Sequence, residues 1–412
     1  MQELSYDSFS KRIVTATAGR RIPLSGTIEL TNRCPLNCSH CYNNLPMNDV
    51  AARKRELTTN EYKDVLDQLA DLGALWVCFS GGEIFARRDF FEIYDYAKAK
   101  GFLVTLFTNG ILIDERVADR LAENRPFSIE ITLYGKTPET YEELTRIPGS
   151  WAKCIRGIEL LRERNLPLKL KTVAVSVNRH EVFEMKAFAE ELGIDFKFDP
   201  MMNPRIDCSS SPLAVRLTPL EAVDLDLRDP ARVEAWHALA KTSVARPLPV
   251  AGENVQVYDC GGGVNSWAID PYGNLTICVL SHVDNFNLRE YTVAEAWEHL
   301  GNVRRKPTTR PTKCTQCAMR SLCGMCAAQG ELENQDAESP VDFLCHTAHL
   351  RVSVLGHEFP LHGECEYCVG GSAHDVIVRE TEQALSAGSR PLIESSISPA
   401  ASCGSGGCSS CT

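Results

Sequence analysis

The residues with the clearest chemical potential are Cys34, Cys38 and Cys41, which lie in the short sequence TNRCPLNCSHCYNN. Three thiolates at CxxxCxxC spacing can ligate one cuboidal iron–sulfur cluster and leave one iron without a protein ligand. A protein that only carries electrons has every iron protected, so an open iron indicates a place where a small chelating molecule binds. A zinc site and a chance group of buried thiols are the alternatives. His40 could be a fourth zinc ligand, but its place between two of the cysteines gives poor geometry for a tetrahedral site.

The composition limits the kind of protein that carries this loop. With 412 residues and 44% hydrophobic content, the chain can form two domains, or one large domain with an extension. A formal charge of −11 gives no basic surface for nucleic acid or anionic lipid. No segment approaches the roughly 18 apolar residues of a membrane helix, and the N-terminus lacks the apolar core of a secretory signal. We therefore expect a cytoplasmic protein that binds neither nucleic acid nor membrane.

The 18 cysteines are unevenly distributed. In the cytoplasm thiols stay reduced, so closely spaced cysteines favour metal or redox cofactors over disulfides. Cys78 and Cys154 lie in an expected strand and an expected helix, and we interpret both as core residues. Cys208 lies in an expected linker, where it is either an exposed residue without a role or an additional cluster ligand. The other twelve cysteines beyond the opening loop fall between residues 260 and 411.

The elements that must position the opening loop alternate between strand and helix. Six β-rich runs are separated by amphipathic helical segments and cover residues 27–30, 74–80, 102–109, 128–135, 168–176 and 194–200. The helix from about residue 59 begins at a capping box of Thr58 and Glu61 and ends at Gly73. This alternation predicts a parallel sheet with right-handed crossovers, as an open α/β sheet or a partial barrel. Active sites of such folds lie where the strands end, which is where the cysteine loop begins.

The cysteine loop at the end of the first strand resembles the radical S-adenosylmethionine (SAM) superfamily. The sequence Ser80-Gly81-Gly82-Glu83 after the second strand resembles the GGE motif of that family, in which backbone and carboxylate receive the SAM amino group. A glycine pair suits this task because no Cβ keeps the main chain away from a ligand. The resemblance covers about residues 25–200 and implies a (β/α)6 partial TIM barrel.

The same resemblance implies further contacts to SAM. Thr108-Asn109-Gly110, Thr132 and Arg146 lie where the family places polar contacts to the ribose and the carboxylate, and His40 should lie near the adenine. An ordinary turn, a surface charge and a packed histidine are the alternatives for these positions. The implied SAM-binding set is His40, Ser80, Gly81, Gly82, Glu83, Asn109, Thr132 and Arg146.

The chemistry implied by the resemblance is that of a radical enzyme. A reduced [4Fe–4S] cluster that chelates SAM at its open iron delivers one electron to the sulfonium, and the 5′-deoxyadenosyl radical formed takes hydrogen from a substrate. The protein then has to position the substrate and exclude water. A low-potential electron donor of the flavodoxin or ferredoxin type is an implied partner.

The second half of the chain resembles the SPASM extension of radical SAM enzymes. It contains Cys260, the stretch AIDPYGNLTIC ending at Cys278, the stretch CTQCAMRSLCGMC, and Cys345. The turn residues PYGN predict a short β-hairpin, and short helices complete the expected domain. The resemblance implies one auxiliary cluster, which could have an open iron, on Cys260, Cys278 and Cys326, and a second, fully ligated one on Cys314, Cys317, Cys323 and Cys345.

Two departures from the SPASM pattern affect these ligand sets. Cys323 and Cys326 are separated by two residues where the family usually has three, and residues 251–259 lack a cysteine found in sulfatase-maturating relatives. A pair of zinc sites is the alternative, because CxxC pairs also occur in zinc ribbons.

Five cysteines lie outside this pattern in the last part of the chain. Cys365 and Cys368 form a further CxxC, which could ligate a cluster, form a redox pair or have no role. The tail IESSISPAASCGSGGCSSCT is too poor in large apolar residues to pack and resembles the core of a ribosomal peptide or a metal-carrying arm. It holds Cys403, Cys408 and Cys411.

We divide the chain into five parts on these grounds. They are an N-terminal segment (1–24), a radical SAM core (25–205), a linker with a helical connection (206–259), a SPASM domain (260–370) and a helical segment with a cysteine-rich tail (371–412).

Enzymes with a SPASM extension mostly act on peptides or proteins. We therefore expect oxidative modification of a side chain in a ribosomal peptide or a protein. A small molecule such as a tetrapyrrole is the alternative substrate, and a non-enzymatic iron–sulfur or metal carrier is the alternative class. The cysteine loop begins at residue 34, which leaves no room before it for a peptide-binding domain. We thus expect either a separate recognition protein or a small substrate.

Overall fold

The computed structural model describes residues 5–244, 255–315, 317–361 and 364–386. Its centre is a nine-stranded sheet in the order β11-β10-β9-β1-β4-β5-β6-β7-β8. Six neighbouring strands in this order are parallel to one another, namely β1 (Ser25–Glu29), β4 (Trp76–Ser80), β5 (Leu103–Thr108), β6 (Ser128–Thr132), β7 (Leu168–Val173) and β8 (Asp195–Asp199). These are the six strands expected from the sequence.

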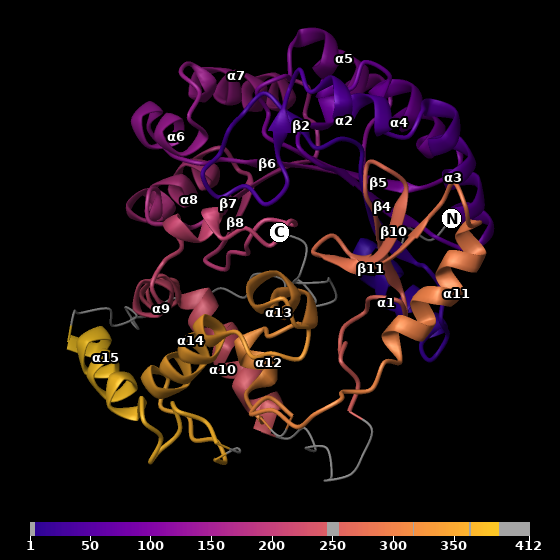
Figure 1. Ribbon diagram of the computed structural model, residues 1–412. Helices are drawn as coiled ribbons and strands as arrows, with labels where there is room; N and C mark the ends of the chain where they lie inside the picture. The colour runs from indigo at the N-terminus through magenta and orange to yellow at the C-terminus, as the bar shows by residue number, and fades with distance from the viewer. Residues whose placement is uncertain (1–4, 245–254, 316, 362–363, 387–412) are drawn as a thin grey trace.

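Helices cover the outer side of this curved sheet, as Figure 1 shows. They are α3 (Thr59–Asp71), α4 (Phe90–Ala99), α5 (Glu115–Glu123), α6 (Pro138–Thr145), α7 (Ser150–Glu163) and α8 (Val182–Glu191). Strand β5 alternates between the two sides of the sheet, because its Val104 and Leu106 are fully buried in the core while Phe107 lines a cavity on the other side. The (β/α)6 partial barrel is confirmed.

Helix α3 shows how local sequence signals fix these elements. Both hydrogen bonds of the predicted capping box are present, since Thr58 Oγ1 accepts from Glu61 N and Glu61 Oε2 accepts from Thr58 N. The helix is followed by Gly73 at a φ of +90°, a conformation that favours glycine. Its inner face buries Tyr62 and Leu66 completely.

The predicted hairpin of the second half is formed by β9 (Ser266–Ile269) and β10 (Asn274–Cys278), and β11 (Ser281–Asn287) extends it. Its position differs from that of a separate domain, because β9 pairs in parallel with β1 from Ser25↔Ser266 to Ile28↔Ile269. Trp267 anchors this pairing: its Nε1 donates to the carbonyl of Pro23 at 2.9 Å, and its ring occupies the space that a Cβ on Gly26 would need. The hairpin therefore continues the barrel sheet.

Further helices complete the fold. They are α1 (Tyr6–Thr17), α2 (Val50–Arg55), α9 (Pro219–Leu227), α10 (Pro230–Val244), α11 (Val293–Arg304), α12 (Arg320–Cys323), α13 (Ala327–Asn334), α14 (Asp342–Val354) and α15 (His374–Ser386). Figure 1 shows α9, α10 and α12 to α15 on the side of the molecule away from α3 to α7. Within this group, Arg351 of α14 forms a buried ion pair with Asp226 of α9, at 2.8 Å.

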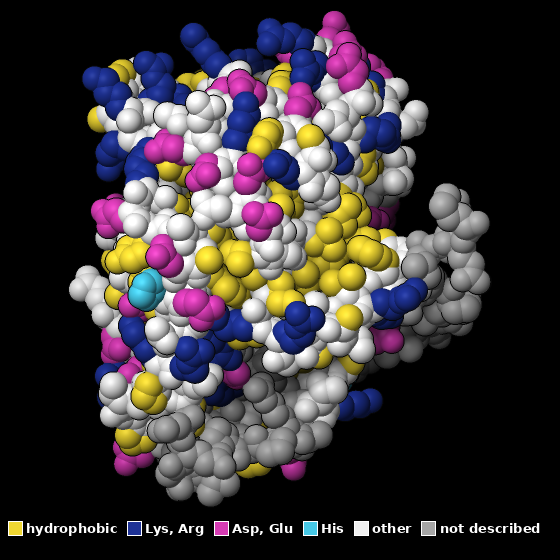
Figure 2. Space-filling view, turned by 90° about the vertical axis from the view of Figure 1, so that its right-hand side faces the viewer, with side chains coloured by type: hydrophobic (Ala, Val, Ile, Leu, Met, Phe, Trp, Pro, Cys, Tyr) yellow, Lys and Arg dark blue, Asp and Glu magenta, His cyan; other side chains and the backbone are white. Residues whose placement is uncertain are grey.

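The outer surface carries charges of both signs. Figure 2 shows acidic and basic side chains around a hydrophobic band on one face. Among the described residues, no helix has the length and apolar character needed to cross a membrane. Cys403, Cys408 and Cys411 lie outside the described residues.

Candidate functional site

A cavity of about 570 Å³ lies where the parallel strands end. All three cysteines of the opening loop contribute to its wall. So do many of the residues expected to contact SAM, namely His40, Ser80, Gly81, Gly82, Asn109 and Thr132. The structure thus brings together residues from the ends of four strands at one opening, as parallel strands require.

The cysteine loop is held from below by the end of helix α6. Asn37 N donates to the Thr145 carbonyl and Ser39 N donates to the Leu144 carbonyl, each at 3.0 Å. These carbonyls belong to the last turn of α6, where they have no partner within the helix. No local pattern in the sequence predicts this contact, because the two residues of each pair are more than a hundred positions apart.

Cys34 is buried and Cys38 and Cys41 are half-buried, and this burial raises the pKa of all three thiols above the usual value. The nearness of the other thiols raises the pKa of Cys34 and Cys38 further. Three thiolates can therefore exist here only beside compensating positive charge, which the irons of a cluster supply. Asn109 Nδ2 donates to Cys34 Sγ at 3.4 Å. The donor set fits an iron–sulfur cluster with three protein ligands.

The glycine pair lies against the chain that leads to the cysteines. Gly81 has a φ of +130°, and a Cβ there would overlap the carbonyl oxygen of Thr31. A Cβ on Gly82 would lie 2.5 Å from the carbonyl oxygen of Asn32, and Gly82 N donates to the Thr31 carbonyl at 2.6 Å. In this structure, then, the close approach that needs glycine is between two loops of the same chain.

Glu83 is buried and is not part of the cavity wall. Its carboxylate accepts from Thr108 Oγ1 at 2.8 Å and from Asn109 N at 2.9 Å. Burial raises the pKa of Glu83 to about 7. The carboxylate therefore ties the loop after β4 to the loop after β5, and its contact with the SAM amino group stays a prediction.

His40 and Arg146 lie in contrasting environments. The His40 ring packs beside Tyr134 with centroids 5.2 Å apart, and burial lowers its pKa to about 4, so the ring is neutral. Its Nδ1 atom is buried and has no hydrogen-bond partner among the described residues, which fits a ring that binds another molecule. Arg146 is exposed at the end of α6, with a φ of +57°, and does not line the cavity.

The inner wall of the barrel carries charged residues that the sequence analysis missed. Lys171 of β7 and Lys197 of β8 lie 3.4 and 3.0 Å from the carboxylate of Glu130 on β6, and both lysines line the cavity with Arg232 of α10. Burial lowers the pKa of Lys171 to about 8. The sequence pattern could have revealed these residues, since a lysine at an inward position of an otherwise apolar parallel strand indicates a polar barrel interior.

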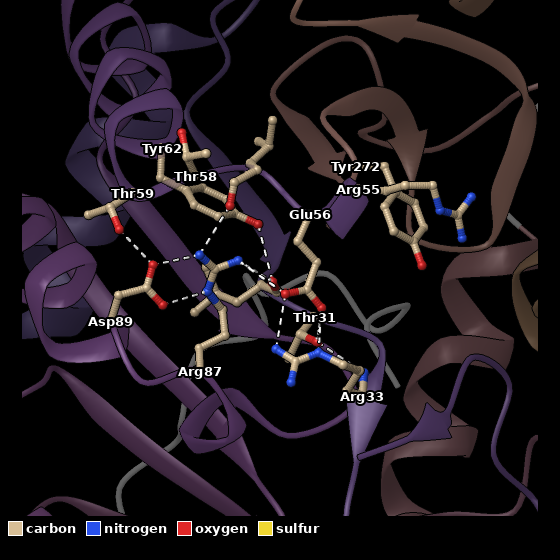
Figure 3. A network of polar contacts seen from close by, with 12 residues as sticks. Thr31, Arg33, Arg55, Glu56, Thr58, Thr59, Tyr62, Arg87, Asp89 and Tyr272 are labelled. Atoms are coloured by element: carbon tan, nitrogen blue, oxygen red, sulfur yellow. Dashed lines mark hydrogen bonds and ion pairs between the residues drawn. The ribbon is translucent and has the colours of Figure 1, made fainter. Parts of the chain in front are cut away.

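A buried polar network supports the loop from the other side (Figure 3). Arg33, which precedes Cys34, donates to the carboxylate of Glu56 from Nε at 2.8 Å and from Nη2 at 3.0 Å. Thr31 Oγ1 donates to the same carboxylate at 2.5 Å, and Arg87 Nη1 lies 3.6 Å from it. Glu56 lies between α2 and α3, so this network fixes the loop to the helices.

The cysteines of the second half form separate groups. Cys260, Cys278 and Cys326 face one another closely enough for the other two thiols to raise the pKa of Cys278, after burial as the main cause. Burial also raises the pKa of Cys326, and Cys260 adds to the shift. These are the three residues expected to hold the first auxiliary cluster.

The second expected set, Cys314, Cys317, Cys323 and Cys345, lines one small pocket together with His349. The short spacing between Cys323 and Cys326 is explained by the chain direction: α12 ends at Cys323, Gly324 adopts a φ of +67°, and α13 begins after Cys326. Cys326 therefore lines a different cavity, of about 290 Å³, which also includes Cys260.

Three cysteines outside these sets can also be placed. Cys154 is fully buried in α7, as expected. Cys78 is only partly buried. The interpretation of Cys208 as an exposed residue is wrong: it is half-buried, packs against an apolar cluster with Val279 and Leu332, and lies with Sγ 3.7 Å from the Glu331 carbonyl.

Comparisons with known proteins place the chain among radical SAM proteins. The family model of the radical SAM superfamily matches residues 28–189. The chain is 27% identical over 325 residues to the AdoMet-dependent heme synthase of Methanosarcina barkeri, covering 73% of this chain and 90% of the relative. It is 28% identical to the PqqA peptide cyclase of Gluconobacter oxydans, covering 76% and 89%. The structure of Streptococcus suis SuiB bound to its precursor peptide SuiA shares the fold, with a TM-score of 0.58 at 18% identity, covering 82% of this chain and 79% of that one.

Proposed function

Because the chain belongs to the radical SAM superfamily and carries a SPASM-type cysteine region, we propose that it is a maturase that modifies a side chain of a ribosomal peptide or a protein. The observation that carries this proposal is the 570 Å³ cavity, where the three-cysteine loop faces the strand ends and the charged barrel interior.

The roles of the residues around the opening follow from their positions. Cys34, Cys38 and Cys41 would hold the [4Fe–4S] cluster, which with bound SAM supplies the 5′-deoxyadenosyl radical. Gly81 and Gly82 keep the strand-end loop against the chain that precedes Cys34. The other expected SAM contacts in the cavity wall are Ser80, Asn109, Thr132 and His40, whose neutral ring suits an aromatic base. Arg146 would need a different conformation to reach the ligand.

The charged barrel wall indicates what the substrate presents. Lys171, Lys197 and Arg232 place three cationic groups on the cavity wall, partly balanced by Glu130. Such a wall favours a substrate that carries carboxylates. An acidic peptide segment meets this requirement, and the PqqA peptide cyclase and the peptide-bound SuiB support a peptide. A tetrapyrrole is the second candidate, supported by the heme synthase relative.

The auxiliary groups and partners complete the proposal. Cys260, Cys278 and Cys326 would hold a first auxiliary cluster, and the expected set for a second is Cys314, Cys317, Cys323 and Cys345, which share one pocket. A flavodoxin or ferredoxin would deliver the electron, and a separate protein would recognise the peptide. All described cysteines are free thiols, which suits the reducing cytoplasm.

The proposal is tested with anaerobically reconstituted, reduced protein and SAM. We expect slow release of 5′-deoxyadenosine, which stops in Cys34→Ala, Cys38→Ala and Cys41→Ala. Cys154→Ala is the matched control, because this cysteine is fully buried and lies outside the cavity. A non-enzymatic carrier protein would release no 5′-deoxyadenosine from SAM, even with its cluster intact.

The substrate class is tested by asking which added compound is modified as 5′-deoxyadenosine is released. Short peptides from neighbouring reading frames, or a tetrapyrrole with free carboxylates, are added to the same assay. A mass change in a peptide that is stoichiometric with 5′-deoxyadenosine supports the maturase, and a change only in the tetrapyrrole supports the second candidate. Lys171→Met should weaken use of either substrate through KM.

A further inference from the structure

A compact group of metal-binding side chains lies in the last described part of the chain, outside the cavity. The ligand atoms of Cys345, His349 and Cys365 lie within 4.8 Å of one another, and Cys365 and His349 are buried. Cys365 Sγ is 3.5 Å and Cys368 Sγ is 3.6 Å from His349 Nε2, while Cys345 Sγ is 4.0 Å from Cys365 Sγ.

The distances from Cys365 to Cys345 and to His349 match those between neighbouring ligands of a tetrahedral zinc site, and Cys368 approaches the same Nε2 from the adjoining turn. Zinc bonds of about 2.3 Å to sulfur and about 2.0 Å to nitrogen place two ligating thiolates about 3.8 Å apart, and a thiolate and an imidazole nitrogen about 3.6 Å apart. A cuboidal cluster binds each thiolate to a different iron, which keeps the sulfur atoms much farther apart than the 4.0 Å between Cys345 and Cys365. The spacing therefore favours one metal ion over a cluster.

The orientation of His349 gives independent support. Its Nδ1 is 2.8 Å from the Cys345 carbonyl, one turn earlier on α14, to which it donates its proton. That hydrogen bond leaves the lone pair of Nε2 directed at Cys365 and Cys368. Ligating histidines usually have this arrangement, with the second nitrogen donating to a carbonyl or a carboxylate.

The local chain conformation suits ligands from two segments. Cys345 and His349 lie four residues apart on one face of α14, and Cys365 and Cys368 lie in a tight turn where Cys368 N donates to the Cys365 carbonyl. A helix with two ligands and a CxxC turn with two more are the parts of many small zinc sites.

We propose that Cys345, His349, Cys365 and Cys368 hold one zinc ion that joins α14 to the turn at residues 364–371. Zinc binds here as three thiols lose their protons to solvent and the neutral imidazole donates its lone pair, with no change in oxidation state. This assigns Cys345 to zinc and leaves Cys314, Cys317 and Cys323 for the second auxiliary cluster.

The experiment counts zinc and iron by mass spectrometry in the full chain, purified without oxygen. We expect one zinc per chain in the wild type. Cys368→Ser, His349→Ala and Cys345→Ser should each lower zinc at least fivefold and leave iron unchanged. His346→Ala is the matched control, because this neighbouring histidine contacts Glu380 at 2.7 Å and lies outside the group. It should keep its zinc.

Three results would overturn the assignment: a wild type without zinc, variants that lose iron and keep zinc, or a Cys345–Cys365 disulfide in the native protein. Replacement of zinc by Co²⁺ in the wild type gives a test that needs no variant, since three thiolates and one imidazole produce intense tetrahedral bands in the visible spectrum. Weak bands typical of octahedral Co²⁺ would contradict the proposed site. Neither measurement depends on SAM cleavage, so this proposal and the proposed function can fail separately.

Discussion

Replacement of Glu56 by Gln should destabilise the protein strongly, because this carboxylate lies between two buried arginines. The side chains of Arg33, Glu56 and Arg87 are 8%, 5% and 6% exposed. Glu56 accepts two hydrogen bonds from Arg33 and one from Thr31. In Glu56→Gln the amide nitrogen would face a guanidinium donor, so one hydrogen bond becomes a contact between two donors, and the charges of both arginines lose a shared partner.

The magnitude follows from the burial of all three groups. Removal of one partner from a buried ion pair costs about 3–5 kcal/mol. With an unfolding entropy of roughly 2.1 cal/mol/K per residue, a chain of 412 residues converts this loss to a decrease in Tm of about 3–6 °C. The network precedes Cys34 directly, so we also expect faster loss of iron from the loop on heating.

The assay is anaerobic thermal unfolding of the iron-loaded protein, followed by circular dichroism, with iron release recorded in parallel. Glu92→Gln is the matched control: Glu92 pairs with Lys63 at 2.5 Å, but its side chain is 58% exposed, and such surface pairs contribute at most about 1 kcal/mol. If Glu56→Gln unfolds within 1 °C of Glu92→Gln, the network does not stabilise the loop and this reasoning is wrong.

Three further variants test other parts of the site. Gly82→Ala places a Cβ 2.5 Å from the Asn32 carbonyl oxygen, and because backbone cannot move aside cheaply we expect a cost of about 1–3 kcal/mol and reduced 5′-deoxyadenosine release; an active, fully stable variant would contradict this. Burial lowers the pKa of Lys171 from 10.5 to about 8, so the folded chain binds fewer protons than the unfolded chain between these values. The buried charge of Lys171 therefore destabilises the folded protein fully below pH 8, and this destabilisation is relieved as the pH rises towards 10.5. The free energy of unfolding gained in Lys171→Met, measured with urea, should shrink by about 3 kcal/mol from pH 7 to pH 10.5. A gain that stays constant with pH would refute this prediction. Cys208→Ala should keep the wild-type iron content, since the Cys208 Sγ contacts the Glu331 carbonyl; loss of iron would identify Cys208 as a ligand.

The sequence predicted the elements whose signals are local. The alternation of β-rich and amphipathic runs located the six strands, and Thr58 with Glu61 marked the start of α3, because these patterns lie within a few residues of one another. The cysteine loop and Gly81-Gly82 were found for the same reason. Their chemistry depends on spacing along the chain.

What the sequence missed depends on contacts between distant segments. Nothing near Asn37 indicates that the end of α6 holds it, and the proximity of Cys345 to Cys365 appears only once α14 and the following turn are packed. Arg146, an expected SAM contact, lies at the exposed end of α6, and its contact with SAM stays a prediction. The polar interior of the barrel could have been predicted from the sequence, because Lys171 follows the fully buried Leu170 in β7 and must therefore point to the opposite side of the sheet.

The pairing of β9 with β1 has a consequence for how the chain is made. During synthesis the edge of β1 is without a partner until residues 266–269 leave the ribosome, more than two hundred residues later. An exposed parallel edge is prone to wrong pairing, and contacts this distant in sequence form slowly. Nascent chains that end before the hairpin should therefore need protection by a chaperone.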